Sequence, residues 1–373
     1  MDTDWYKITQ SQVVFNQFPE AVVEYEFINR GNTKFPNGFD VLLRRQIDLL
    51  SLLKMTKPEH AWLRNIRYIK PTFADWFANY SYNPEEVNVS LKDGDLTVLI
   101  RGPWYRTIHW EIVLLAMISE LYFQGVEPQK NFETKMVEKG NYLQKEDCSW
   151  IDFGTRRRFS FAVQKKLVEI MKQFKGFHGT SNPYLAYLMN VTPVGTYAHE
   201  GPMAMQAKYG AYASNQMWNE AWVKEYKGDL GIALTDTLTT PFFLKSFDMF
   251  MSKLFDGVRQ DSGDPYKIGE RYIQHYNYMK IDPRSKRIIF SDSLDAIEGV
   301  QLTKAFRHHV KPCLGIGTNF TNDVGVKPLN IVIKMRCADF GHGLRHVVKL
   351  SDMEGKVTGD KNTVDHVKWE IVA

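Results

Sequence analysis

The sequence has no apolar run long enough to cross a membrane. The longest wholly apolar stretch, Ile112–Ile118, is far shorter than the roughly 18 to 20 residues that a spanning helix needs. The first ten residues, MDTDWYKITQ, have neither the basic start nor the apolar core of a secretory signal. These absences predict a cytoplasmic protein that is not bound to a membrane.

Cysteine is scarce, and charge of one sign is nowhere concentrated. Cys148, Cys313 and Cys337 are widely separated and form no C-x-x-C motif, which fits a reducing compartment and excludes a cysteine-based zinc site. The 47 basic and 43 acidic residues give a formal net charge of +4 without a long basic block. Nucleic acid is therefore not expected as a partner, and any recognition of anions must be local.

The composition is that of a globular protein, and the first part of the chain has a mixed pattern. Hydrophobic residues make up 44% of the 373 residues, enough for one large core or two ordinary ones. Residues 39–53 have apolar side chains at helical spacing, and residues 110–123 are apolar enough for a buried helix. Residues 21–30 and 93–102 alternate between apolar and polar side chains, as half-buried strands do. We predict a small α+β domain over residues 1–125.

From about residue 148 the pattern changes to short β-type runs that end in polar or glycine residues and precede helical stretches. The runs are WIDFGTRRR, FHGTSN, VTPVGTYAHE, LGIALTDT, LFDGVRQDSGDP, RIIFSDSLD, CLGIGTNF and LNIVIKM. Most of them are spaced to suit one strand–loop–helix unit each. The predicted fold class is therefore α/β, with an irregular (β/α) barrel over residues 126–335. Residues 336–373 are a candidate addition to the N-terminal domain.

In such a barrel the carboxyl ends of the strands meet on one face, where the active site is expected. The turn RQDSGDP brings Arg259, Asp261 and Asp264 together. Carboxylates suit Mg²⁺ or sugar hydroxyls, and a guanidinium suits a flat anion. An aspartate that caps a helix, beside a surface arginine, is an equally good interpretation of the turn.

Two further strand ends are candidates for binding a sugar phosphate. Gly315, Gly317 and Thr318 lie in GIGTN, where glycines would allow backbone N–H groups to approach a phosphate, although a tight turn explains the same residues. Asp292 lies in FSDSLD, which indicates either sugar or metal binding or the capped start of a helix.

His199 and Glu200 follow the run that ends in GTYAHE. Position 203 is methionine, so the H-E-x-x-H motif of zinc proteases is absent. A single histidine at a strand end is more often a structural residue. Placed where strand ends meet, it could instead act as a general base or accept a phosphoryl group, with a carboxylate orienting its other nitrogen.

A basic and aromatic segment offers a site for an aromatic acid. In DFGTRRRFS, Phe153 precedes three consecutive arginines, of which Arg156 is the first. An aromatic ring and a guanidinium could stack on the ring of such an acid and pair with its carboxylate, although a solvated basic turn is the common alternative. The sequence leaves open which of the three arginines faces a pocket. Tyr6, in DTDWYK, is either a further ring of this kind or a packing residue.

Taken in order, DTDWYKITQSQVVF, DFGTRRRFS, GTSN, TPVGTYAHE, ALTDT, VRQDSGDP, FSDSLD, GIGTNFTND and VKPLNIVIKM resemble the nicotinate phosphoribosyltransferase family, over about residues 2–360. The resemblance implies a type II phosphoribosyltransferase fold. It also implies ATP-coupled synthesis of nicotinate mononucleotide from nicotinate and phosphoribosyl pyrophosphate, in the salvage route to NAD.

The resemblance further implies roles for individual residues. His199 would be phosphorylated by ATP, with Asp261 and Glu200 as the other catalytic candidates. Nicotinate would contact Tyr6, Phe153, Arg156, Thr196 and Arg259, and a stacking tyrosine would come from the partner subunit of a homodimer. The phosphoribosyl group would contact Asp261, Asp292, Gly317 and Thr318, and Asp261 and Asp292 would hold Mg²⁺.

Two other functions are consistent with parts of this pattern. A related enzyme that uses nicotinamide or quinolinate would share the fold, because fold alone does not determine the substrate. The segment GTSN has no acidic residue, whereas relatives that use nicotinamide have an aspartate in that region. A nucleotide sensor without catalysis is disfavoured, because His199, Arg259, Asp261, Asp264 and the glycine turn are all present.

Overall fold

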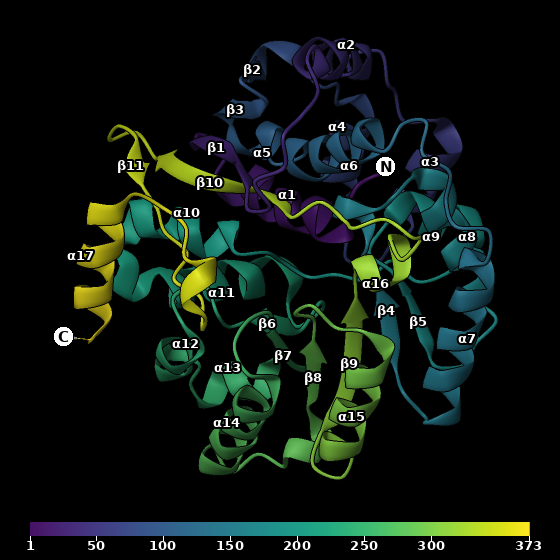
Figure 1. The fold of residues 1–373 in the computed structure, drawn as a ribbon. Helices are drawn as coiled ribbons and strands as arrows, with labels where there is room; N and C mark the ends of the chain where they lie inside the picture. The colour runs from purple at the N-terminus through teal and green to yellow at the C-terminus, as the bar shows by residue number, and fades with distance from the viewer. Residues whose placement is uncertain (373) are drawn as a thin grey trace.

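The protein, described here as a computed structural model over residues 1–372, has an antiparallel sheet and a parallel sheet (Figure 1). The antiparallel sheet has the strand order β11-β10-β1-β3-β2. Its strands are β1 (Val22–Asn29), β2 (Val87–Lys92), β3 (Asp95–Pro103), β10 (Ile331–Asp339) and β11 (Arg345–His346). The strands predicted at 21–30 and 93–102 are thus confirmed as β1 and β3.

One interior strand of this sheet, β10, comes from the far end of the sequence. β10 pairs antiparallel with β1 along its whole length, from Val22 opposite Asp339 to Asn29 opposite Ile331. Apolar and polar side chains alternate along the first part of β1, which explains why its sheet is buried on one face: Val23 and Tyr25 are buried, and the residues next to them are partly exposed. The domain limits at residues 125 and 335 stay a prediction, and β10 spans the second of them.

The helices of the N-terminal part surround the antiparallel sheet. They are α1 (Trp5–Gln17), α2 (Phe39–Leu50), α3 (Lys57–Arg64), α4 (Pro71–Asn79), α5 (Trp104–Thr107) and α6 (Trp110–Tyr122). The two helices predicted here are confirmed as α2 and α6. Eight residues of α6 are buried, as expected for a helix that is apolar on most of its circumference.

The parallel sheet has the order β5-β4-β9-β8-β7-β6. Its strands are β4 (Trp150–Asp152), β5 (Phe177–Thr180), β6 (Ile232–Leu234), β7 (Gly257–Gln260), β8 (Arg287–Phe290) and β9 (Lys311–Ile316). The helices of this part are α7 (Phe132–Lys145), α8 (Phe161–Met171), α9 (Pro183–Met189), α10 (Glu200–Tyr209), α11 (Ala211–Tyr226), α12 (Thr240–Ser246), α13 (Met249–Leu254), α14 (Pro265–Tyr278), α15 (Ala296–Phe306), α16 (Thr318–Thr321) and α17 (Lys361–Val372).

The α/β class with a parallel sheet is confirmed, whereas two of the eight predicted barrel strands are not part of that sheet. The run VTPVGTYAHE forms only an isolated bridge between Thr180 and Pro193, and LNIVIKM is β10 of the antiparallel sheet. Pro193 cannot donate to a strand ladder, and Gly195 has a φ of +152°. Strand pairing among residues 1–372 therefore gives an open six-stranded order and no closed barrel.

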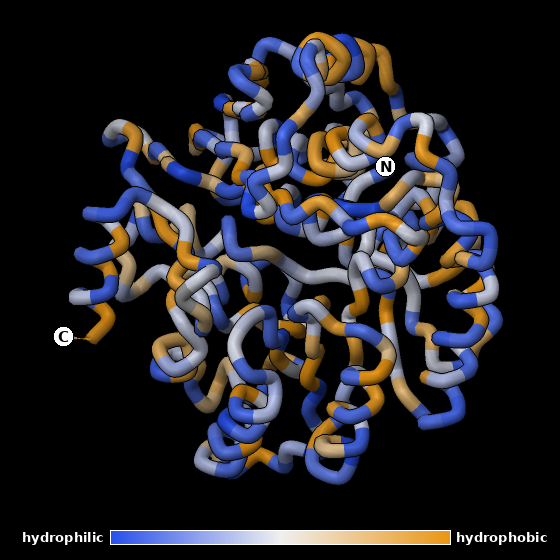
Figure 2. Tube along the Cα trace, viewed as in Figure 1, coloured by the Kyte–Doolittle hydropathy of each residue, from blue (hydrophilic) through white to orange (hydrophobic). Residues whose placement is uncertain are grey.

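One continuous hydrophobic core connects the two sheets. It includes Tyr25 of β1, Trp150 of β4 and Phe290 of β8, all nearly or fully buried. Figure 2 shows hydrophobic residues along the parallel strands and hydrophilic residues over much of α7 and α14 at the edge of the molecule. Within residues 1–372, the helices are all too short or too polar to cross a membrane.

Candidate active site

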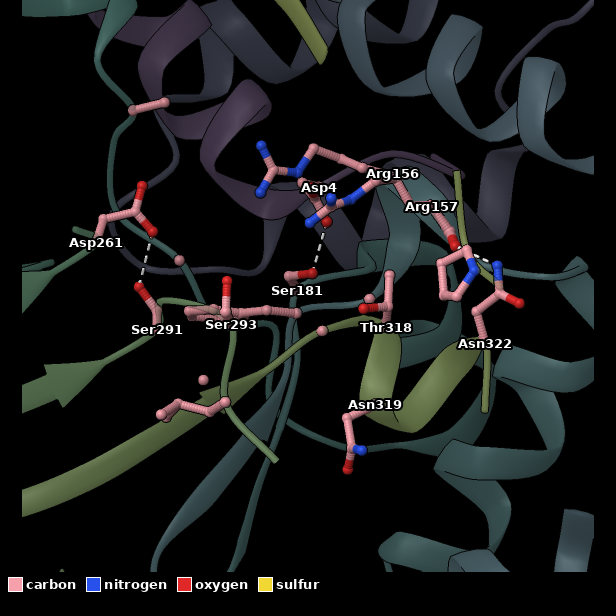
Figure 3. Close-up of a pocket in the computed structure, with 18 of the residues that line it drawn as sticks. Asp4, Arg156, Arg157, Ser181, Asp261, Ser291, Ser293, Thr318, Asn319 and Asn322 are labelled. Atoms are coloured by element: carbon pink, nitrogen blue, oxygen red, sulfur yellow. Dashed lines mark hydrogen bonds between the residues drawn. The ribbon is translucent and has the colours of Figure 1, made fainter. Parts of the chain in front are cut away.

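A cavity of about 420 Å³ lies where the two sheets meet. Phe153, Asp261 and Gly317 line it directly after β4, β7 and β9, so the carboxyl ends of the parallel strands form one part of its wall. Tyr6 of α1 and Lys334 of β10 add side chains from the antiparallel layer. Figure 3 shows labelled polar residues from these segments gathered around the cavity.

His199 sits at the cavity with hydrogen bonds to both ring nitrogens. Its Nε2 lies 3.0 Å from Asp261 Oδ2, and its Nδ1 lies 3.1 Å from Thr237 Oγ1. Burial, reinforced by the charge of Lys349, lowers the pKa of His199 to about 4. The imidazole is therefore neutral at pH 7. Because an ionised carboxylate can only accept, Nε2 carries the proton and Nδ1 the lone pair.

Two aspartates support this histidine. Asp261 accepts a hydrogen bond from Ser291 Oγ at 3.0 Å, a contact drawn in Figure 3. Despite the penalty of burial, the hydrogen bond from His199 and the charge of Arg259 hold the pKa of Asp261 well below its usual range. Asp236 is fully buried, and its Oδ1 lies 3.9 Å from His199 Nε2.

The second oxygen of Asp236 is held by the protein. Ser262 donates to Asp236 Oδ2 at 2.6 Å, and Lys349 Nζ lies 3.1 Å from the same atom. Asp236 Oδ1 is buried without a hydrogen-bond partner. One ligand atom from each of His199, Asp236 and Asp261 falls within 4.8 Å of the others, a spacing that a metal ion could bridge.

Four cationic side chains line the cavity without an ion-pair partner among residues 1–372: Arg156, Arg157, Arg259 and Lys334. Arg259 Nε is buried and makes no hydrogen bond. Burial and the charges of Arg156 and Arg30 lower the pKa of Arg157 to about 10. Burial lowers the pKa of Lys334 to about 8, with Glu111 opposing the shift. Half-buried cations without an ion pair indicate a ligand that brings negative charge.

The cavity also has two aromatic side chains, Tyr6 and Phe153. Tyr6 is 8% exposed and belongs to the same chain as the rest of the lining. Phe153 lies against β9, where a Cβ atom on Gly315 would come within 2.5 Å of its ring. Glycine at position 315 therefore makes room for the ring at the edge of the cavity.

The structure brings most of the predicted site residues together. Those that line the cavity are Tyr6, Phe153, Arg156, His199, Arg259, Asp261, Gly317 and Thr318. The arginine question is also answered, because Arg156 and Arg157 line this cavity whereas Arg158 is buried and paired with Asp2 and Glu120. Asp264 caps α14, which confirms the helix-cap interpretation of RQDSGDP for that residue, whereas Asp261 and Arg259 line the cavity and their binding of a ligand stays a prediction.

Three predicted residues are not among the residues that line the cavity. Thr196 donates to the carbonyl of Ile232 at 2.8 Å. Glu200 is buried and pairs with Lys7 at 2.8 Å. Asp292 pairs with Lys356. The roles that the family resemblance assigns to these three residues stay predictions.

Sequence reasoning missed several residues that line the cavity or lie beside His199. Asp236 carried a detectable signal, because it closely follows the apolar strand β6 as other site residues follow theirs. Asp4, whose carboxylate accepts from Ser181, lies beside Tyr6 in the segment DTDWYK. Lys334 carried no signal, because its position in an apolar strand does not reveal which sheet the strand joins.

A parallel α/β sheet with a histidine–aspartate pair, aromatic rings and unpaired cations at its carboxyl edge is typical of an α/β protein that binds small molecules. The model of the nicotinate phosphoribosyltransferase (NAPRTase) family matches residues 148–371, and that of the NAPRTase N-terminal domain matches residues 1–119. The chain belongs to the nicotinate phosphoribosyltransferase family.

Individual relatives agree with this assignment. The nicotinate phosphoribosyltransferase of Desulforapulum autotrophicum is 41% identical over 98% of this chain and 96% of its own length. The nicotinate phosphoribosyltransferase of Chromohalobacter salexigens is 42% identical over 99% of this chain and 96% of its own length. The crystal structure of the enzyme from Porphyromonas gingivalis superposes with a TM-score of 0.97 at 36% identity, covering 100% of this chain and 98% of that one. The crystal structure of the enzyme from Vibrio cholerae superposes with a TM-score of 0.92 at 32% identity, covering 100% of this chain and 92% of that one.

Proposed function

We propose that this chain is a nicotinate phosphoribosyltransferase that forms nicotinate mononucleotide and pyrophosphate from nicotinate and phosphoribosyl pyrophosphate, coupled to ATP hydrolysis, in NAD salvage. The observation that carries the proposal is the set of four unpaired cations around two aromatic rings and a carboxylate-bound histidine, all among residues 1–372. All three substrates are anions, and one of them is an aromatic acid. The names of the relatives support nicotinate as that acid.

Nicotinate needs a surface for its ring and positive donors for its carboxylate. Tyr6 and Phe153 supply aromatic faces, and Arg259 and Arg156 supply guanidinium groups in the same cavity. The unpartnered Nε of Arg259 supports a direct contact, because a carboxylate would satisfy it. Nicotinamide lacks the charge that would compensate these arginines.

The phosphoribosyl group has a different requirement. Its transfer passes through an oxocarbenium-like state, so the enzyme must hold the two phosphate ends and align the pyridine nitrogen with C1 of the ribose. Gly317 and Thr318 are suited to the 5-phosphate, with backbone and hydroxyl donors after β9. Arg157 and Lys334 supply charge for the pyrophosphate.

The carboxylates of Asp236 and Asp261, beside His199, fit a magnesium ion. The orphaned Oδ1 of Asp236 supports this, because a cation would satisfy a buried oxygen that the protein leaves without a partner. Asp236 and Asp261 would hold the ion, which when bound would offset negative charge on the phosphates. Asp292, the other predicted ligand, is engaged by Lys356 and lies outside the three-residue group.

The coupling to ATP is proposed to pass through His199. Nδ1 attacks the γ-phosphorus of ATP, so a nitrogen–phosphorus bond forms, the bond to the β,γ-bridging oxygen breaks, and ADP leaves with the electron pair. Thr237 must first turn its hydroxyl away from Nδ1. The proton on Nε2 stays hydrogen-bonded to Asp261, which stabilises the positively charged phosphohistidine. Water later takes the phosphoryl group and releases phosphate.

Two residues implied by the resemblance receive positioning roles. Glu200 directly follows His199 and starts α10, and its ion pair with Lys7 fixes the start of that helix. Thr196 joins the preceding segment to β6 through its bond to Ile232. Neither side chain needs to touch a substrate in order to hold His199 in place.

We further propose that the site is shared within a homodimer, as the resemblance implies. Tyr6 lies in the cavity of its own chain together with Phe153, so one chain supplies both aromatic rings. The partner subunit would add the stacking tyrosine that the resemblance implies.

The function is tested by measuring turnover of nicotinate, nicotinamide and quinolinate with phosphoribosyl pyrophosphate, each with and without ATP. We expect turnover of nicotinate alone, strongly stimulated by ATP. Faster turnover of either other pyridine, or a nicotinate rate that does not respond to ATP, would contradict the proposal.

Arg259→Ala tests the pocket assignment. Loss of a charge-assisted hydrogen bond costs about 1.5–3 kcal/mol, so we expect the KM for nicotinate to rise by about tenfold or more while the KM for ATP changes little. Arg284→Ala is the matched control, because Arg284 pairs with Asp282 on the surface. Steady-state kinetics with each substrate varied in turn gives both constants. Unchanged nicotinate saturation would refute the contact.

A further inference from the structure

A second cavity, of about 820 Å³, lies between the N-terminal part of the chain and the start of the parallel part. Most of its lining comes from the first residues of the chain, the end of α2, α4 and α6, with Arg158, Phe161 and Tyr184 from the parallel part. It includes no residue of the active-site cavity. This volume lies in the range of cavities that bind drug-sized molecules, which is about 300–1,000 Å³. None of the steps of the proposed reaction uses it.

Aromatic side chains line much of this cavity, and they surround one histidine. The lining includes Phe77, Tyr80, Tyr82, Phe161, Tyr184 and His109. The imidazole of His109 lies 4.9 Å from the ring of Phe77 and 5.0 Å from that of Tyr80, centroid to centroid. Flat aromatic walls favour a flat aromatic ligand, because rings at these separations stack or meet edge to face.

His109 is also the polar group that is left unsatisfied there. It is 1% exposed, its Nε2 lies 3.1 Å from Ser11 Oγ, and its Nδ1 is buried without a hydrogen-bond partner. Burial, aided by the charge of Lys7, lowers the pKa of His109 to about 3, so the ring is neutral at pH 7. An unpaired buried nitrogen costs free energy that a ligand with one polar edge would recover.

The charged side chains of the lining are already engaged within residues 1–372. Arg158 pairs with Asp2 at 2.6 Å and with Glu120 at 2.7 Å. Glu59 accepts from the Thr56 backbone at 2.7 Å, and Lys54 donates to Ser81. Lys54 and the α-amino group of Met1 are the two cations of this lining without an ion-pair partner among residues 1–372, whereas the active-site cavity has four.

We propose that this second cavity is a binding site for a planar heteroaromatic molecule that hydrogen-bonds to His109 Nδ1, and that its occupancy changes the affinity of the active site. Leu49 and Leu53 of the α2 end form an exposed apolar part of the lining, where such a molecule can enter.

The two cavities share a wall, which provides the physical basis for coupling. Along the start of the chain, Asp2 lines the second cavity and Asp4 lines the active site. Along the segment after β4, Arg156 lines the active site and Arg158 lines the second cavity. The ion pair between Arg158 and Asp2 connects the two segments, so a ligand that displaces it moves residues beside Asp4 and Arg156.

The binding test uses indole, benzimidazole and quinoline as probes, titrated at pH 7.5 and observed by saturation-transfer NMR. Indole presents a hydrogen-bond donor, quinoline an acceptor and benzimidazole both. Together they can therefore bind either tautomer of His109. We expect at least one to bind with a submillimolar Kd, and saturating nicotinate to shift that Kd by the coupling factor without displacing the probe. Binding of none of them, or full displacement by nicotinate, would overturn the proposal.

Two variants locate the bound probe. Met117→Trp fills the cavity from α6 and should weaken probe binding at least tenfold, whereas the matched control Met249→Trp, on α13 outside both cavities, should not. His109→Phe keeps the ring but removes the hydrogen bond, and should weaken binding about fivefold. Probe binding that survives Met117→Trp would overturn the site. So would dissociation of a wild-type dimer by that variant, because a second copy of the chain would then cover the cavity.

The coupling is measured by calorimetric titration of nicotinate with and without saturating probe, which requires no turnover. We expect the nicotinate Kd to change by about fivefold or more, the lower end of known allosteric couplings, and the change to vanish in Met117→Trp. An unchanged Kd would overturn the coupling. Because the probe titrations need neither ATP nor phosphoribosyl pyrophosphate, they remain decisive even if the proposed reaction fails its own test.

Discussion

At the scale of single residues, the active-site cavity is defined by charges that the protein does not neutralise. Desolvation of a buried or half-buried cation without a partner destabilises the folded protein by several kcal/mol. Such a cation is therefore expected where a bound anionic ligand offsets this cost. Lys334 shows this most clearly, because burial lowers its pKa to about 8 and no ion pair restores it among residues 1–372. Its charge is therefore present at pH 7 and is lost as the pH rises through 8.

Lys334 predicts a pH dependence of substrate binding. We expect kcat/KM for phosphoribosyl pyrophosphate to fall above about pH 8, because that constant reports ionisation of the free enzyme. Lys334→Met should lower kcat/KM about tenfold or more at pH 7 and flatten the decline above pH 8. Lys327→Met, at an exposed lysine, is the control. An identical alkaline decline in Lys334→Met would show that another group titrates.

At the scale of elements, the site depends on where parallel strands end. The polar turns after β4, β7, β8 and β9 are visible in the sequence, because each follows a short apolar run, and this regularity predicts that Phe153, Asp261 and Gly317 lie near one another. The sequence pattern could not assign β10 to its sheet, because a run of apolar residues is equally compatible with a parallel and an antiparallel sheet. For the same reason Lys334 could not be predicted.

Strand β9 packs closely against the turn after β4 because Gly315 has no side chain. A Cβ at position 315 would lie 2.5 Å from the ring of Phe153 and 3.1 Å from Ser291 Cβ. Gly315→Ala should therefore displace Phe153, raise the KM for nicotinate several-fold and lower the free energy of unfolding by about 1–3 kcal/mol. Gly31→Ala is the control, because its Cβ would meet only ordinary contacts at 3.4 Å. Kinetics and urea unfolding of the two variants give the comparison, and equal nicotinate KM values would contradict the packing argument.

At the scale of the whole molecule, a buried ion triad joins three helices. Lys7 of α1 is fully buried, 2.6 Å from Glu111 of α6 and 2.8 Å from Glu200 of α10. Glu111 and Tyr6 both line the active-site cavity, and Glu200 adjoins His199. The triad therefore keeps the antiparallel part and the parallel part of the chain aligned around the cavity.

Lys7→Met tests this alignment. Removing the lysine leaves two carboxylates buried without a cation between them, so we expect the free energy of unfolding to fall by about 3–5 kcal/mol. Lys34→Met, in an exposed pair with Asp95, should cost less than about 1 kcal/mol. Denaturant unfolding at pH 7 measures both. A loss in Lys7→Met no larger than in Lys34→Met would show that the triad does not hold the two parts together.

The central claim is that His199 stores the phosphoryl group of ATP, and labelling tests it most directly. After incubation with ATP carrying ³²P in the γ-position, we expect acid-labile, alkali-stable phosphate on the peptide that contains His199, approaching one per chain. His199→Asn should carry none, lose the ATP stimulation of nicotinate turnover and keep its fold by circular dichroism. Phosphate absent from the wild-type chain, or retained in His199→Asn, would contradict the account.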